Sequence, residues 1–124
     1  MTLPLTCELW RDPETALARP MKDQFERAET LFQDSHHWRY LLVCRGCGAR
    51  YMLEFYEEID WDDGDDPSWV SYVPVQSEAQ LVAMRAAFEP LALRGFPPYL
   101  QMDHPKGAPK APPTWMGRDP SVGV

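Results

Sequence analysis

The alternation of hydrophobic and polar positions is most regular in the middle of the chain. At the start of the segment from Tyr51 to Ile59, Tyr51, Leu53 and Phe55 alternate with Met52, Glu54 and Tyr56. The run from Trp38 to Val43 is dense in aromatic and aliphatic residues. Both patterns are typical of β-strands. The segment that joins them, Cys44-Arg45-Gly46-Cys47-Gly48, contains two glycines, which favour a tight turn. The sequence therefore predicts a hairpin in this region.

Three other segments have strand-like composition. Trp69 to Val75 predicts a third strand, and Pro74 favours a place at its end or at a sheet edge because proline has no N–H to donate. Tyr99 to Met102 predicts a short final strand after the interruption at Pro97-Pro98. Leu3 to Trp10 predicts another short strand near the start of the chain.

Helical spacing predicts two main helices. From Met21 to Phe32 the hydrophobic residues lie three or four positions apart, with charged residues between them. The second helix follows Ser77, which forms a capping box with Gln80, and it should end at Pro90. A brief helix is also expected after Asp12-Pro13, because Asp can cap a helix whose first turn contains Pro.

A length of 124 residues is that of one domain. We expect residues 1–103 to form a single globular domain, and residues 104–124, which are rich in Pro and Gly, to form an extended tail. The predicted fold class is α+β: a small antiparallel sheet built on the CxxCG-turn hairpin, with two packing helices.

The net charge of −7 restricts the possible partners. It disfavours unaided binding to nucleic-acid phosphates or to anionic lipid, both of which require a basic face. A basic protein partner or a cation fits better. No basic-then-apolar leader follows Met1, and no apolar run approaches the ~18–20 residues that cross a bilayer. We therefore expect a cytoplasmic protein.

The pair Cys44 and Cys47 has the spacing of a metal-binding turn. Zinc prefers thiolate and imidazole ligands in a tetrahedron, and a CxxC turn directs two sulfur atoms to one point. We expect the metal ligands to be Cys44, Cys47, His37 and Cys7, with zinc as the cofactor; His36 and His104 are the alternatives of the right chemical type. The competing interpretation is that the two cysteines are small hydrophobic residues at a tight turn.

A redox role for the same pair is a weaker alternative. Thioredoxin-type CxxC pairs place the first thiol at a helix N-terminus, whereas a strand is predicted after Cys47. Arg45 and Arg50 could still stabilise a thiolate. Three cysteines in all, an odd number, suit a reducing compartment better than a disulfide framework.

An acidic segment follows the hairpin, and no Lys or Arg occurs between Arg50 and Arg85. It superficially resembles a calcium-binding loop, but the required glutamate at the twelfth position is absent. Two interpretations remain: a solvated loop, or a surface that attracts a basic protein and anchors it through aromatic residues. For the second, the expected partner-binding residues are Glu57, Glu58, Asp60, Trp61, Asp62, Asp63, Asp65, Asp66 and Trp69.

Sequence motifs of catalysis are missing. The chain has no nucleophile elbow, no phosphate-binding glycine loop and no HExxH. A dense run of carboxylates is expected to be exposed, whereas catalytic carboxylates need burial that separates their pKa values. We therefore expect a protein that is not an enzyme.

The run from Tyr40 to Tyr51 resembles the knuckle hairpin of zinc-ribbon proteins, over about a tenth of the chain, although the second CxxC of a ribbon is absent. In overall character the chain is similar to small acidic bacterial immunity proteins. That likeness implies a protein-binding factor that neutralises a basic toxin through its acidic, aromatic-rich face. The alternative hypothesis is a small zinc- or thiol-dependent factor whose CxxC knuckle is the working site.

Overall fold

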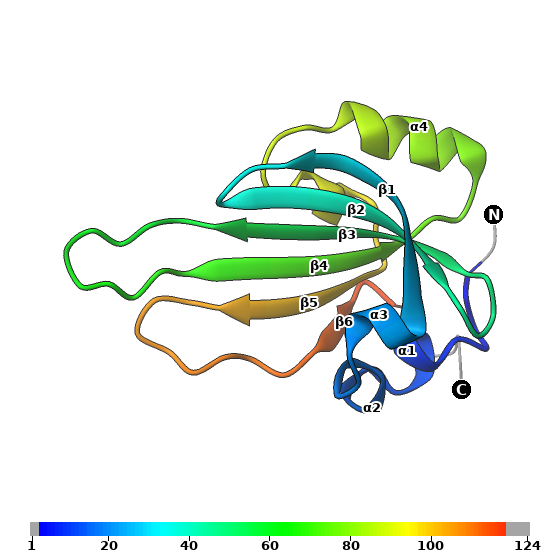
Figure 1. The fold of residues 1–124 in the computed structure, drawn as a ribbon, viewed down its shortest axis with the longest axis horizontal. Helices are drawn as coiled ribbons and strands as arrows, with labels where there is room; N and C mark the ends of the chain where they lie inside the picture. The colour runs from blue at the N-terminus through cyan, green and yellow to red at the C-terminus, as the bar shows by residue number, and fades with distance from the viewer. Residues whose placement is uncertain (1–2, 119–124) are drawn as a thin grey trace.

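The structure is a computed structural model that describes residues 3–118. Six antiparallel strands form one sheet in which each strand pairs with its neighbours in the sequence, in the order β1-β2-β3-β4-β5-β6 (Figure 1). The predicted α+β class with an antiparallel sheet is confirmed. The strands are β1 Phe25–Gln33, β2 His37–Cys44, β3 Arg50–Glu57, β4 Ser68–Pro74, β5 Tyr99–His104 and β6 Thr114–Met116.

Short helices connect and flank the sheet. Ser77 caps the longest of them, with its Oγ accepting a hydrogen bond of 3.1 Å from the Gln80 N–H, as the sequence predicts. Asp12 caps the second helix through the Thr15 N–H, which confirms the brief helix expected there. The helices are α1 Glu8–Arg11, α2 Pro13–Leu17, α3 Met21–Gln24, α4 Glu78–Ala86 and the 3-10 helix η1 Ala92–Gly95.

The prediction of a helix from Met21 to Phe32 is wrong beyond its first turn. The chain leaves α3 at Gln24 and continues as β1, which pairs with β2 along its length. Two register shifts, after Arg27 and after Thr30, interrupt the pairing. Because each bulge adds a residue on one strand, the alternation that marks a strand is lost, and hydrophobic residues fall at helical intervals by coincidence.

The short strand predicted from Leu3 to Trp10 is also wrong. This segment turns at Leu5-Thr6 and enters α1, which buries Leu9 and Trp10 completely or nearly so. Burial of two large side chains by one helical turn stabilises this arrangement more than strand propensity would. As a result, the N-terminal segment packs across the sheet and does not extend it.

The segment after Asp103 contributes to the sheet, which differs from the extended tail expected there. Thr114–Met116 pairs with β5 as β6, and the Trp115 Nε1–H donates a hydrogen bond of 3.1 Å to the Leu9 carbonyl. Trp115 also packs against the ring of Trp10, with ring centroids 4.7 Å apart. The remainder of the predicted tail, 119–124, lies outside the described residues.

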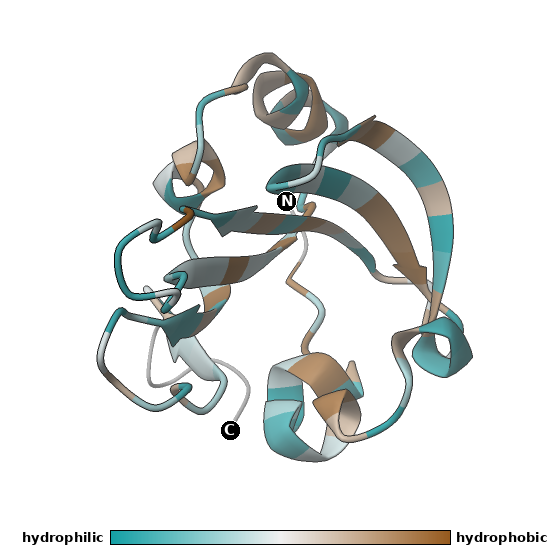
Figure 2. Cartoon of the chain, turned by 60° about the vertical axis from the view of Figure 1, so that its left-hand side comes forward, coloured by the Kyte–Doolittle hydropathy of each residue, from teal (hydrophilic) through white to brown (hydrophobic). Residues whose placement is uncertain are grey.

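The sheet is strongly curved, and its two faces carry separate hydrophobic clusters (Figure 2). On one face α4 and η1 cover the sheet. The members of this cluster are Leu41, Met52, Val73, Val75, Leu81, Met84 and Leu93. On the other, concave face the N-terminal helices pack against one end of the strands. Its buried members are Cys7, Leu9, Trp10, Ala16, Phe25, Tyr40, Leu42, Tyr51, Leu53, Tyr72 and Leu100.

A buried ion pair joins α4 to the sheet. Arg39 on β2 and Glu54 on β3 are directly opposite each other and fully buried, with Glu54 Oε2 3.0 Å from Arg39 Nε and 2.9 Å from Nη2. Arg39 also donates hydrogen bonds to the carbonyls of Ala87 and Glu89, just after the end of α4. The other Glu54 oxygen accepts from the Leu91 N–H at 3.2 Å. This pair therefore satisfies the backbone groups of the segment that leaves the helix.

Candidate metal centre and acidic surface

The CxxC turn is built by the end of β2 and the start of β3. The Cys44 N–H donates to the Ala49 carbonyl and the Gly48 N–H donates to the Cys44 carbonyl, each at 2.8 Å. Gly48 has a φ of +79°, which favours glycine because a β-carbon would be strained there. These bonds close the predicted hairpin turn.

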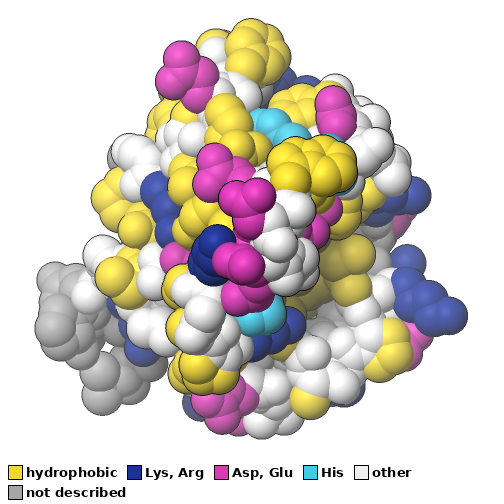
Figure 3. Space-filling model, turned by 90° about the vertical axis from the view of Figure 1, so that its left-hand side faces the viewer, with side chains coloured by type: hydrophobic (Ala, Val, Ile, Leu, Met, Phe, Trp, Pro, Cys, Tyr) yellow, Lys and Arg dark blue, Asp and Glu magenta, His cyan; other side chains and the backbone are white. Residues whose placement is uncertain are grey.

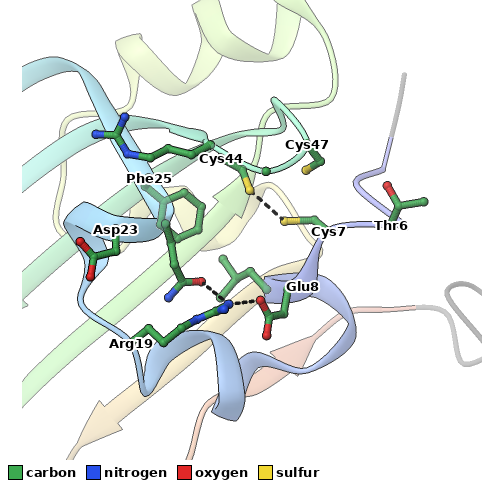
Figure 4. A pocket seen from close by; sticks show the side chains of 12 residues that line it. Thr6, Cys7, Glu8, Arg19, Asp23, Phe25, Cys44 and Cys47 are labelled. Atoms are coloured by element: carbon green, nitrogen blue, oxygen red, sulfur yellow. Dashed lines mark hydrogen bonds and ion pairs between the residues drawn. The ribbon is translucent and has the colours of Figure 1, made fainter.

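A third cysteine reaches this turn from the N-terminal segment. Cys7 is the residue immediately before α1, and its Sγ lies 3.8 Å from the Sγ of Cys44, 37 residues away in the sequence. Figure 4 shows Cys7 facing Cys44 and Cys47 across the mouth of a pocket. The turn is also tied to α3, since the Arg45 N–H donates to the Gln24 carbonyl at 2.8 Å and Arg45 Nε donates to the Lys22 carbonyl at 3.1 Å.

The three sulfur atoms lie within 4.8 Å of one another and could hold a metal ion. All three cysteines are free thiols. They differ in accessibility, because Cys7 is buried, Cys44 is half-buried and Cys47 is exposed. The cluster therefore has one side fixed in the core and one side open to solvent, and it joins two segments that are distant in the sequence.

Cys7 and Cys44 have pKa values shifted in opposite directions. Burial raises the pKa of Cys7 to about 11, and the neighbouring Tyr51 hydroxyl offsets only part of that effect. Burial also acts to raise the pKa of Cys44, but N–H groups of Cys47 and Gly46 directed at its sulfur outweigh it, and the net pKa lies below the usual value. Cys44 thus becomes the thiolate that a metal requires more readily than Cys7 does.

Tyr51 completes the buried side of the cluster. Its hydroxyl is buried and makes no hydrogen bond among the described residues. Burial raises its pKa far above the usual range, and the Cys7 thiol adds to that effect. A phenolic O–H that remains protonated can donate a hydrogen bond to a neighbouring thiolate. Hydrogen bonds of this kind orient metal ligands. Nothing in the sequence pattern distinguishes Tyr51 from other strand aromatics.

A cavity of about 440 Å³ opens next to the thiols. Arg19 and Glu8 form an ion pair across it, and Asp23 and Thr6 lie on its wall (Figure 4). In the described part of the chain no His, Asp or Glu joins the three cysteines as a fourth potential ligand. The cavity adjoins the thiols and has room for a further ligand such as water.

The inclusion of His37 among the metal ligands is wrong. His37 and Cys44 are the first and last residues of β2, so an extended strand separates them by roughly 23 Å at about 3.3 Å per residue. His37 instead contacts Glu54, with Nε2 2.7 Å from the carboxylate. The alternatives are equally remote: His36 lies beside Glu57 at 3.0 Å, and His104 is opposite Ser68 in the sheet.

Comparison with known proteins gives no further guide to this site. No family model, no curated protein and no solved structure matches the chain. Function is therefore inferred from the residues and their geometry alone.

The acidic segment forms the loop between β3 and β4, and part of its charge is neutralised within the chain. Lys106, from the loop between β5 and β6, lies 2.9 Å from Asp60 and 3.0 Å from Asp63. The Lys106 ammonium lowers the pKa of Asp60, assisted by the N–H groups of Asp63 and Asp62. Asp66 accepts a hydrogen bond of 2.7 Å from the Asp60 N–H. These contacts give the loop a fixed conformation and join it to its neighbour.

The remaining predicted partner-binding residues differ in exposure. Trp61 is 89% exposed, whereas Trp69 is half-buried on β4 and stacks on Tyr56 with ring centroids 5.5 Å apart. Glu58 and Asp62 are exposed. Figure 3 shows Asp and Glu side chains gathered on this end of the molecule, with a large hydrophobic side chain above them. Glu58, Trp61 and Asp62 thus belong to one exposed region, which we call the acidic surface.

Among the described residues, no helix is long and apolar enough to cross a membrane.

Proposed function

We propose that the chain is a zinc-binding protein in which Cys7, Cys44 and Cys47 supply three thiolate ligands. The observation that supports this proposal most strongly is the distance of 3.8 Å between the Cys7 and Cys44 sulfur atoms. Zinc–sulfur bonds of about 2.3 Å in a tetrahedron place two sulfur atoms about 3.8 Å apart. The separation therefore has the value that a shared metal ion would impose, and it is far too long for a disulfide bond.

Zinc at this position would connect the N-terminal segment to the sheet. Cys7 is the residue from which α1 begins, and Cys44 and Cys47 belong to the β2–β3 turn. A metal ion bound to all three would close a loop of 37 residues and hold α1 against the concave face. The fourth ligand would be water or a small molecule from the adjoining cavity, because three protein ligands leave one position open.

The proposal is tested by metal analysis of the protein and of single-cysteine variants. Protein purified with zinc and without chelator should contain about one zinc per chain. Cys47→Ser removes the exposed ligand with the least effect on packing, and it should weaken zinc binding by more than about 100-fold in a competition titration. Thr6→Ala, on the same cavity, is the matched control and should bind zinc like the wild type. Wild-type zinc affinity in Cys47→Ser would remove Cys47 from the ligand set.

A second candidate function is recognition of a basic protein partner, which could include a toxin, by the acidic surface. The observation that favours it is the exposure of Trp61 beside uncompensated carboxylates. Aromatic side chains in such positions are frequent anchors of protein interfaces, and the surrounding charge accelerates encounter with an oppositely charged protein.

Separate kinetic effects are expected for the charge and for the anchor. Replacing Glu58 and Asp62 by their amides should slow association with a basic partner and reduce its salt dependence, because exposed charges act mainly on encounter. Trp61→Ala should raise the dissociation rate. The measurement is surface plasmon resonance on a partner captured with the wild-type chain, with Glu14→Gln as an exposed control elsewhere. Unchanged rates for both variants would eliminate this candidate.

A further inference from the structure

The concave face of the sheet carries a groove that is separate from the thiol cluster. It has a volume of about 670 Å³, within the roughly 300–1,000 Å³ typical of pockets that bind small molecules. Its floor comes from β2 to β5, and α3 and β1 form one side. No cysteine lines it. A hollow with hydrophobic side chains in its floor is visible in Figure 3, with Lys or Arg side chains at its outer rim.

The apolar floor follows from the register of the sheet. Trp38, Phe55, Val70 and Met102 are opposite one another on four consecutive strands and form one continuous row. All four remain partly exposed, whereas the next row on this face is buried under the N-terminal helices. Trp38 and Phe55 stack on each other at a centroid distance of 4.0 Å, so this part of the floor is aromatic. Partly exposed apolar side chains in a row are uncommon on a protein surface unless something binds there.

The charge of the groove is opposite to that of the protein. Lys22, Arg27 and Arg45 line it and no Asp or Glu does, although the chain carries a net charge of −7. Among the described residues these three cations form no ion pair with a carboxylate, whereas Arg50, Arg85 and other cations of the chain do. Arg27 lies over the Tyr40 ring at 4.6 Å, which directs its guanidinium along the groove wall. The cationic groups are therefore available to an anion.

Polar and apolar parts occupy different ends of the groove. The cations come from α3, β1 and the turn after β2, whereas Val70 and Met102 come from β4 and β5. From β1 to β5 the groove crosses five strands, which is about 19 Å at a spacing of about 4.8 Å. An elongated molecule with an anionic head and an apolar tail matches this arrangement, because its head would meet the cations while its tail lies along the aromatic row.

We propose that this groove binds a free long-chain carboxylate, with the carboxylate near Lys22 and Arg27 and the alkyl chain over Trp38 and Phe55. Binding buries the exposed row and provides the cations with an anionic partner. The proposal does not depend on the metal centre, since the thiols are outside the groove.

Isothermal titration with dodecanoate below its micelle concentration tests the proposal. We expect saturable binding of one dodecanoate per chain, and much weaker binding of octanoate, because each buried methylene contributes up to about fourfold in affinity. Dodecyltrimethylammonium, which has the same tail and the opposite charge, should bind much more weakly. Equal binding of the two headgroups, or no saturable binding of dodecanoate, would overturn the proposal.

Variants separate the headgroup from the tail. The double variant Lys22→Gln/Arg27→Gln should weaken dodecanoate binding by about tenfold, since each exposed charge pair contributes about two- to fivefold. Arg11→Gln, at an exposed cation away from the groove, is the matched control and should bind like the wild type. Val70→Asp should abolish dodecanoate binding, and circular dichroism checks that this variant is folded. If Val70→Asp is unfolded, the headgroup variants alone test the proposal. Binding to anionic lipid vesicles in place of monomeric dodecanoate, or self-association that dodecanoate does not reverse, would also contradict the proposal.

Discussion

Arg39→Met is expected to lower the free energy of unfolding by about 3–5 kcal/mol, a large part of the roughly 5–15 kcal/mol that stabilises a typical domain. The substitution preserves much of the side-chain volume but leaves Glu54 in the core without its guanidinium partner. It also removes the donors that satisfy the carbonyls of Ala87 and Glu89. Urea denaturation followed by circular dichroism measures the effect.

A more exposed ion pair that links α4 to the sheet supplies the control. Arg85 on α4 contacts Glu29 on β1, and both side chains are exposed to a similar degree. Arg85→Met should therefore cost about 1 kcal/mol or less. If Arg39→Met were no more destabilising than Arg85→Met, the buried pair would not be what holds the end of α4 to the sheet.

Zinc is expected to raise the melting temperature strongly. A ligand that binds only the folded chain stabilises it by about 4 kcal/mol at a free concentration of about 1,000 times its Kd. For a chain of this size the corresponding shift is on the order of 15 °C. The shift should become smaller as the pH falls, because protons compete with zinc for the thiolates and burial has raised the pKa of Cys7.

Cys7→Ala should remove most of this zinc-dependent shift. Each variant is measured by differential scanning calorimetry with zinc and with a chelator, so that any loss of packing from the substitution itself cancels in the difference. Thr6→Ala should retain the full shift. A zinc-dependent shift of wild-type size in Cys7→Ala would show that the N-terminal segment is not held by the metal.

The local features of the hairpin could be predicted from the sequence. The dense run before Cys44, the alternation after Tyr51 and the glycines of the turn act over a few residues, and the structure has β2, the turn and β3 there. The Ser77 cap is equally local. By contrast, β1 contains two bulges that erase the strand alternation, so its sequence resembles a helix.

The candidate site could be predicted only in part, because it is assembled from distant segments. Cys7 could be proposed from its chemical type, but its approach to Cys44 depends on how α1 packs on the sheet. His37 has the right chemistry and is close in sequence, yet an extended strand carries it away from the turn. The groove was not predictable at all, since its row of apolar residues exists only once four strands are in register.

X-ray absorption at the zinc edge of the purified, zinc-loaded protein measures the ligand set itself. We expect three sulfur neighbours at about 2.3 Å and one oxygen or nitrogen neighbour at about 2.0–2.1 Å. This set corresponds to Cys7, Cys44 and Cys47 with a fourth ligand from the cavity. Fewer than three sulfur neighbours, or a coordination sphere composed of oxygen and nitrogen, would contradict it.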